Sequence, residues 1–259
     1  MGRKEIKIQR WTSRSLGIIF FVLGSQNLIS SSIDNHQERF EDVALKIWEY
    51  AELGYLEEKS SNLLQQELKD SGFTIQSGIA EIPTAFVAEY NNDGPVIGIL
   101  GEFDALPGLS QQNLPYKTAE GLSSANGHAC GHHLFGAASA WAVVAIKEWL
   151  EESGTPGTIR FYGTPAEEGG SGKVYIARDG YFDDVDIVLH WHPASGNSAD
   201  AQSSNSNKSG KFTFSGISAH AASAPEKGRS ALDGVEAMNM MVNMMREHIP
   251  QELSLIHIS

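Results

Sequence analysis

Strands and helices are predicted to alternate from residue 84 to residue 190, and this order constrains the fold more than any other feature of the chain. The strands are read from β-branched and aromatic runs at 84–90, 96–100, 158–163 and 186–190. Between them, helices are predicted at 134–151 and 171–178, and two further helices at 36–53 and 58–71 come first. Asn91-Asn-Asp-Gly94 joins the first two strands as a hairpin-like turn. This alternation predicts an α/β fold.

A second domain is predicted to begin near residue 205. Residues 194–210 are rich in Ser, Asn, Ala and Gly and are interpreted as a linker. A strand at 211–214 and a helix at 230–245 follow. We therefore divide the chain into a first domain at 32–204, the opening part of a second at 205–252, and an atypical tail at 253–259.

The N-terminal segment, 1–31, differs from the rest of the chain. Five basic residues precede a short apolar run at 16–23, and small and polar residues follow it. This order is typical of a secretory signal, and the run is too short for a comfortable membrane span. We expect an exported protein, with an uncleaved N-terminal anchor as the alternative.

Charge and cysteine content exclude two classes of protein. The formal net charge of -13 argues against a nucleic-acid binder, which needs a basic face. The single cysteine, Cys130, excludes an intramolecular disulfide framework.

The densest group of candidate ligands is Gly-His-Ala-Cys-Gly-His-His at 127–133. Cys130 and His132 are two residues apart, so in an extended segment both side chains point toward the same ion. Such a pair by itself is often accidental. Three further polar clusters, each following a predicted strand, favour a metal site.

These clusters supply carboxylates and histidines. Glu167 and Glu168 are adjacent carboxylates, which suits one ligand and one group acting on the attacking water. His190 and His192 follow the last strand, where ligands often bind in α/β folds. Asp104 is suited to orient a ligating imidazole.

Four motifs together resemble one known family. They are Gly-Glu-Phe-Asp-Ala-Leu-Pro-Gly-Leu-Ser, Gly-His-Ala-Cys-Gly-His, Thr-Pro-Ala-Glu-Glu-Gly-Gly and Phe-Ser-Gly-Ile-Ser-Ala-His-Ala-Ala. The family is that of the co-catalytic metallopeptidases, which includes aminoacylases, auxin-conjugate amidohydrolases and carboxypeptidases. Ile-Pro-Thr-Ala-Phe-Val-Ala-Glu and Trp-His-Pro bring the chain nearest to its p-aminobenzoyl-glutamate hydrolase branch.

The resemblance implies a three-layer α/β/α catalytic domain with a mixed sheet, followed by the start of a small α+β dimerisation or lid domain. It implies two divalent ions, zinc or manganese, held by Cys130, His132, Glu168 and His192, with His190 as the fallback for His192. Glu167 would be the general base toward a metal-bound water, and Asp104 would orient a ligand. His220, in the second domain, would steady the tetrahedral oxyanion in the site of the partner subunit.

The implied reaction is hydrolysis of the amide bond in an N-acyl amino acid or a dipeptide-like substrate such as p-aminobenzoyl-glutamate, by a homodimer. The sequence departs from the family pattern in two places. His133 occupies a position where relatives carry Asp or Asn, and the family-like sequence ends near residues 251–252. The alternative interpretation is therefore an inactive truncated fragment, or a non-catalytic module that binds metal or a partner.

Overall fold

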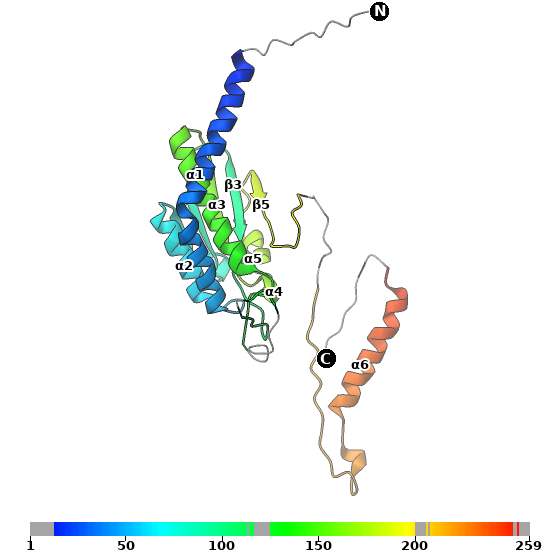
Figure 1. Ribbon diagram of the computed structural model, residues 1–259. Helices are drawn as coiled ribbons and strands as arrows, with labels where there is room; N and C mark the ends of the chain where they lie inside the picture. The colour runs from blue at the N-terminus through cyan, green and yellow to red at the C-terminus, as the bar shows by residue number, and fades with distance from the viewer. Residues whose placement is uncertain are drawn as a thin grey trace, which may run out of the picture. The chain divides into compact units, whose positions relative to one another are not determined.

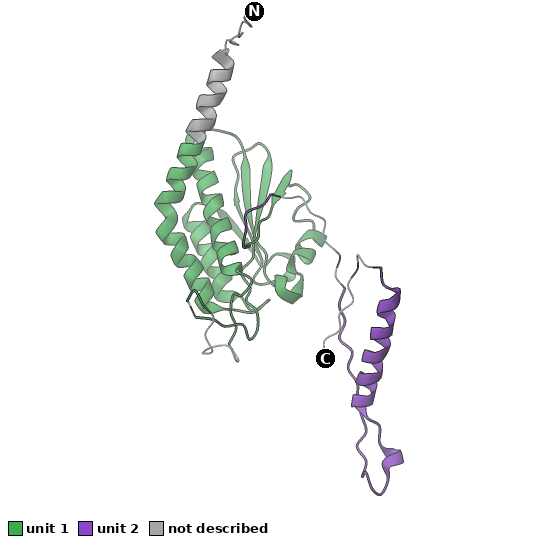
Figure 2. Cartoon of the chain, turned by 45° about the vertical axis from the view of Figure 1, so that its right-hand side comes forward, with its two compact units in different colours: residues 1–195 green, residues 196–259 purple. Residues whose placement is uncertain are grey.

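The computed structural model describes residues 13–112, 114–116, 125–199, 206, 208–250 and 253, with the backbone alone for 13–25. It divides into two compact units, 1–195 and 196–259, coloured separately in Figure 2. The predicted boundary at 204/205 lies outside the described residues, as do residues 1–12 of the predicted signal segment and most of the tail.

The first unit contains most of the regular structure (Figure 1). Its elements are α1 (Ser13–Tyr50), α2 (Glu58–Asp70), β1 (Thr74–Ser77), η1 (Ile79–Glu81), β2 (Phe86–Tyr90), β3 (Val96–Gly101), α3 (His132–Ser153), β4 (Thr158–Gly163), α4 (Glu167–Gly170), α5 (Gly172–Arg178) and β5 (Ile187–Leu189).

The five strands form one mixed sheet in the order β1-β2-β4-β3-β5. β1 pairs with β2, and β2 with β4, in antiparallel fashion. β3 pairs in parallel with both β4 and β5. The carboxyl ends of these three parallel strands therefore meet at one edge of the sheet, where α/β proteins place their ligands.

Helices pack on both faces of the sheet. α1, α2 and α3 contact one another and cover one face. The core on that face is built from the apolar stripes of these helices and the inward side chains of the strands: Phe40, Val43, Ile47, Leu64, Leu68, Val143, Phe86, Ile99, Ile159 and Phe161. A smaller core covers the other face and includes Ile79, Ile82, Val87, Leu100, Tyr162 and Ile176. The predicted α/β fold with a mixed sheet flanked by helices is thus confirmed.

The predicted hairpin at 91–94 is wrong. β4 lies between β2 and β3 and hydrogen-bonds to both. The connection at 91–94 instead contacts the segment that leads into β4. The Asn92 side-chain amide donates from Nδ2 to the Thr155 carbonyl at 3.1 Å, and the Gly157 amide donates to the Asn92 carbonyl at 3.2 Å. A turn sequence between two strands therefore does not show that those strands pair.

Other boundaries differ for local reasons. α1 begins 23 residues before the predicted helix start at 36 and ends at Tyr50, because Ala51 takes a left-handed conformation with φ of 42°. β1 was not predicted, and its four residues are mostly exposed. Among the described helices, none is both long and apolar enough to be a candidate membrane span.

The second unit contains η2 (Pro225–Lys227), α6 (Ala231–Met245) and η3 (Arg246–His248). The helix predicted at 230–245 is confirmed, and the Ser230 hydroxyl caps it by accepting the Asp233 amide at 3.1 Å. The strand predicted at 211–214 is wrong, because no described residue pairs with it as a strand.

Candidate metal centre

Four segments that follow strands or precede a helix meet at the carboxyl edge of the parallel strands. Glu102 and Asp104 follow β3, and Glu167 and Glu168 form the start of α4, after β4. His190 and His192 follow β5. Cys130 and His132 lie at the start of α3. The sheet order thus gathers residues that are up to 90 positions apart in the sequence.

The prediction that an extended segment points the Cys130 and His132 side chains toward the same ion is wrong, because this segment is not extended. Gly131 has a left-handed φ of 81°, and the chain turns there into α3. Because glycine adopts this conformation without steric cost, the turn places Cys130 just outside the helix and His132 in its first position. Gly136 then allows α3 to approach closely, since a Cβ there would lie 2.7 Å from the Glu102 carbonyl oxygen.

His132 is the centre of the cluster and is fully buried. Its Nδ1 lies 2.9 Å from Asp104 Oδ1 and donates to that carboxylate, which leaves Nε2 as the nitrogen that can bind a metal once it loses its proton. Nε2 lies 2.9 Å from Glu102 Oε2 and 3.9 Å from a carboxylate oxygen of both Glu167 and Glu168. The structure therefore brings the predicted His132, Asp104, Glu167 and Glu168 together.

Cys130 and His192 lie beside this centre. Cys130 Sγ is 3.4 Å from His192 Nε2, and His192 Nδ1 is 2.9 Å from the Pro193 carbonyl oxygen. Since a carbonyl can only accept, Nδ1 carries the proton and Nε2 offers a lone pair toward the sulfur. His190, the fallback, instead lies 3.6 Å from Glu102 Oε1.

Among the residues that the structure describes, two groups have ligand atoms that all lie within 4.8 Å of one another. One is Cys130, His132 and His192, and the other is Glu102, His132 and Glu167. His132 belongs to both. Glu102 was missed by the sequence reasoning, although it stands in the same motif as Asp104 and directly after β3.

The polar atoms of this cluster fit a cation. Glu168 Oε1 is buried and has no hydrogen-bond partner, and Glu102 Oε2 and His132 Nε2 are buried with only each other, at 2.9 Å, as a possible partner. Buried polar atoms are rarely left in this state, and carboxylates brought this close repel each other unless a positive charge is shared. Imidazole, thiolate and carboxylate donors suit zinc first among the common divalent ions.

The electrostatics of the cluster support the same interpretation. Burial alone would raise the pKa of Glu102, but bonding to His132 and the charge of Lys173 outweigh it and lower that pKa to about 2. Burial, followed by the nearby carboxylates led by Glu168, raises the pKa of the Cys130 thiol to about 11. Burial would lower the pKa of His132, but its bonds to Asp104 and Glu102 raise it to about 10.

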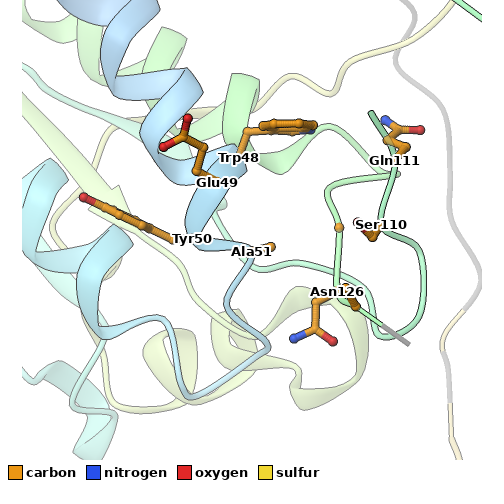
Figure 3. Close-up of a pocket in the computed structure, with 9 residues that line it drawn as sticks. Trp48, Glu49, Tyr50, Ala51, Ser110, Gln111 and Asn126 are labelled. Atoms are coloured by element: carbon orange, nitrogen blue, oxygen red, sulfur yellow. The ribbon is translucent and has the colours of Figure 1, made fainter. Parts of the chain in front are cut away.

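Two cavities of the first unit differ in their distance from the metal centre. One of about 300 Å³ reaches Asp104 and Glu168 and is lined by Leu53, Gly54, Tyr55, Ala105, Pro107, Ala166, Gly169 and Gly170. Another of about 540 Å³ opens between the end of α1 and the segment around Ser110 and Asn126 (Figure 3). None of the residues lining the second cavity is a candidate ligand, so the first is the one adjacent to the site.

His220 lies in the second unit and is exposed. Its Nδ1 accepts the backbone amides of Ala222 and Ser223, each at 3.2 Å. A nitrogen that accepts two N–H groups carries no proton, so Nε2 is the nitrogen left to donate when the ring is neutral.

Comparison with known proteins places the chain in a family. Residues 98–230 match the peptidase family M20/M25/M40. The chain is 43% identical to a subunit of the p-aminobenzoyl-glutamate hydrolase of Escherichia coli over 221 residues, which are 85% of this chain and 46% of that protein. It is 30% identical to the human Xaa-Arg dipeptidase over 234 residues, 84% of this chain and 49% of that protein. The chain spans about half the length of these curated relatives.

Solved structures share the fold. A dinuclear metal-binding peptidase of the M20 family from Bacillus subtilis matches with a TM-score of 0.54 and 26% identity, over 62% of this chain and 44% of that one. The aminobenzoyl-glutamate utilization protein of Klebsiella pneumoniae matches with a TM-score of 0.54 and 17% identity, over 79% of this chain and 57% of that one. The family match spans the strand-end motifs that build the site. The chain belongs to the peptidase family M20/M25/M40.

Proposed function

We propose that the protein is a metal-dependent hydrolase of the amide bond in N-acyl amino acids or dipeptide-like substrates such as p-aminobenzoyl-glutamate. The observation that carries this proposal is the convergence of the Glu102 and Glu168 carboxylates on the buried His132, with Glu168 Oε1 left without a hydrogen-bond partner. The names of the relatives, which are a p-aminobenzoyl-glutamate hydrolase and a Xaa-Arg dipeptidase, supply the substrate class.

Two divalent ions, zinc or manganese, fit the donors present. We propose Cys130, His132, Glu168 and His192 as ligands, with Glu102 beside them and His190 as the fallback. When bound, the ions would polarise the substrate carbonyl and make a water molecule more acidic. The solved relative from Bacillus subtilis is described as binding a dinuclear metal centre.

The two adjacent glutamates would divide the work. Both lie 3.9 Å from His132 Nε2, and Glu167 rather than Glu168 belongs to the ligand group with Glu102 and His132, but burial and bonding favour Glu168 as the ligand. The Glu168 side chain is the less exposed, 20% against 44%, and its amide is held by Asp104 Oδ2 at 2.9 Å. We therefore assign Glu168 as a ligand and Glu167 as the general base.

Glu167 would take a proton from the attacking water and return it to the leaving amine nitrogen. Burial, followed by the charge of Glu102, raises the pKa of Glu167, which brings its carboxylate closer to the strength that proton transfer near neutral pH requires. His220 would donate from Nε2 to the developing oxyanion in a homodimer, with the second unit as the opening of a dimerisation domain. The exposed apolar residues of α6, Leu232, Met240, Met241, Met244 and Met245, support a role in association.

Export is part of the proposal and rests on the basic and apolar pattern of residues 1–31. N-terminal sequencing of protein recovered from an exporting host would reveal cleavage within this segment. An intact N-terminus on membrane-bound protein would favour the anchored alternative.

The function is tested by loading the chain with Zn²⁺ or Mn²⁺ and measuring amino-acid release from p-aminobenzoyl-glutamate, an N-benzoyl amino acid and a Xaa-Arg dipeptide. We expect metal-dependent release that falls about 100-fold or more in Glu167→Gln, which keeps its metal. Glu152→Gln, an exposed glutamate on α3, is the matched control. A chain that binds metal and releases nothing from any substrate would support the alternative of a non-catalytic metal-binding fragment.

A further inference from the structure

Glu57 is a fully buried carboxylate in the connection between α1 and α2, outside the motifs that supply the metal centre. Its Oε1 accepts the backbone amide of Ala166 at 2.8 Å. Its Oε2 accepts the hydroxyl of Thr84 at 3.1 Å. Because a buried carboxylate is costly unless its oxygens are bonded, both contacts are needed to keep this side chain inside the fold.

The amide that Glu57 accepts belongs to the residue just before Glu167. Ala166 has φ of 56° and ψ of 43°, a left-handed conformation that a non-glycine residue adopts only when its surroundings impose it. That conformation sets the direction in which the chain leaves β4 for Glu167 and Glu168. The bond from Glu57 therefore fixes the point from which both glutamates project.

The rest of the connection supports the same turn. Tyr55 donates its hydroxyl to the Gly170 carbonyl at 2.5 Å. A Cβ at Gly54 would lie 3.0 Å from both Cα and Cβ of Ala166, so the backbones pack directly against each other. Leu53 also forms a parallel bridge with Ala105, next to Asp104. The α1–α2 connection thus contacts the segments that follow both β3 and β4.

We propose that Glu57 is a positioning residue that holds the Glu167–Glu168 turn in the geometry of the metal centre, through its bond to the Ala166 amide. The effect of this positioning on metal binding rests on the proposed function. The positioning of the turn itself can be measured without metal or substrate. Outer groups that orient ligands commonly change metal affinity about 10- to 100-fold when removed.

Three substitutions separate the effect of the hydrogen bond to the Ala166 amide from the effects of the charge and the volume of the Glu57 side chain. Glu57→Gln keeps an acceptor for the Ala166 amide and can donate to the Thr84 hydroxyl, so it preserves both contacts without charge. Glu57→Met keeps most of the volume and loses the acceptor. Glu57→Asp keeps the charge and shortens the reach. Leu68→Ala, at a buried position in the core under α2, controls for general destabilisation.

The first measurement is amide hydrogen exchange of peptides covering residues 164–171 in the metal-free chain. We expect exchange in Glu57→Met and Glu57→Asp to be about tenfold faster or more than in the wild type, with Glu57→Gln like the wild type and Leu68→Ala changed mainly in α2. If Glu57→Met does not fold, the comparison of exchange at residues 164–171 between Glu57→Asp and Glu57→Gln tests the inference. Wild-type exchange at 164–171 in Glu57→Asp, or equal loosening in Glu57→Gln, would overturn the inference.

The second measurement is Co²⁺ affinity of the same variants, by titration against a chelator. We expect affinity to fall about 10-fold or more in Glu57→Met and Glu57→Asp and to be retained in Glu57→Gln. Loosened exchange with unchanged Co²⁺ affinity would overturn the link to the metal centre. A wild-type chain that binds no Co²⁺ but shows the expected exchange pattern would overturn the proposed function while supporting the positioning of the turn.

Discussion

Asp104 Oδ1 lies 2.9 Å from Nδ1 of His132, at the carboxyl end of the parallel strands and in a fully buried environment. The second oxygen of the same carboxylate accepts the Glu168 amide at 2.9 Å. One carboxylate thus orients an imidazole from α3 and a glutamate from α4. Both of its oxygens act as acceptors, which is a role that only the ionised acid fills completely.

Asp104→Asn should weaken metal binding about 10- to 100-fold. An asparagine offers one acceptor and one donor, but His132 Nδ1 and the Glu168 amide both donate at this site, so in either orientation the new NH₂ group faces another donor. Chelator competition with Zn²⁺ measures the effect. Asp93→Asn, in the exposed 91–94 connection, is the control. Equal affinity in Asp104→Asn and the control would show that Asp104 does not orient the ligands.

Metal binding at pH 7 should release about two protons from the ligands. The pKa of Cys130 is raised to about 11 and that of His132 to about 10, so both groups hold a proton in the metal-free chain at this pH. Calorimetric titration in buffers of different ionisation enthalpy counts the protons. Cys130→Ser should release about one proton fewer. An unchanged count in Cys130→Ser would mean that the thiol is not a ligand.

Glu57→Gln should change how stability depends on pH. Burial, the largest effect, raises the pKa of Glu57 to about 7, well above the ordinary value of 4.5. The folded state therefore holds the proton more tightly than the unfolded state. Protonation of Glu57 therefore stabilises the fold fully below pH 4.5. As pH rises through 7, the free energy of unfolding falls by about 3 kcal/mol.

A glutamine does not titrate, so Glu57→Gln should gain stability relative to the wild type as pH rises from about 5 to about 8. Urea unfolding of the two proteins in chelator, at several pH values across this range, gives the difference directly. A constant difference across the range would contradict the raised pKa.

His192→Ala should reduce bound metal, and His190→Ala should leave it nearly unchanged. Of these two, only His192 has a ring nitrogen within the ligand group of Cys130 and His132, at 3.4 Å from Cys130 Sγ. The Nε2 atom of His190 instead lies 3.6 Å from Glu102 Oε1. Elemental analysis of the two variants decides between them, and the reverse order would make His190 the ligand.

The sequence predicted the α/β class, the main helices and the strand-end position of the site, because these follow from periodicity and from polar motifs placed after apolar strands. It did not predict that β4 separates β2 from β3, since strand pairing is a long-range property that the 91–94 turn does not determine. β1 was missed because its four residues are mostly exposed and carry no clear pattern.

Glu102 and Glu57 illustrate what the motifs alone could not provide. Glu102 was visible in the same motif as Asp104, but only the fold shows its carboxylate facing His132. Glu57 lies 109 positions from Ala166, and nothing in the local sequence indicates that it accepts that amide. Contacts of this kind depend on the packing of the α1–α2 connection against the turn after β4.

The most direct test of the metal centre is the metal content per folded chain, measured by elemental mass spectrometry on protein purified without chelator. We expect about one to two equivalents of divalent metal, lost in large part in Cys130→Ser. A folded chain that carries no metal after incubation with Zn²⁺ would contradict this expectation.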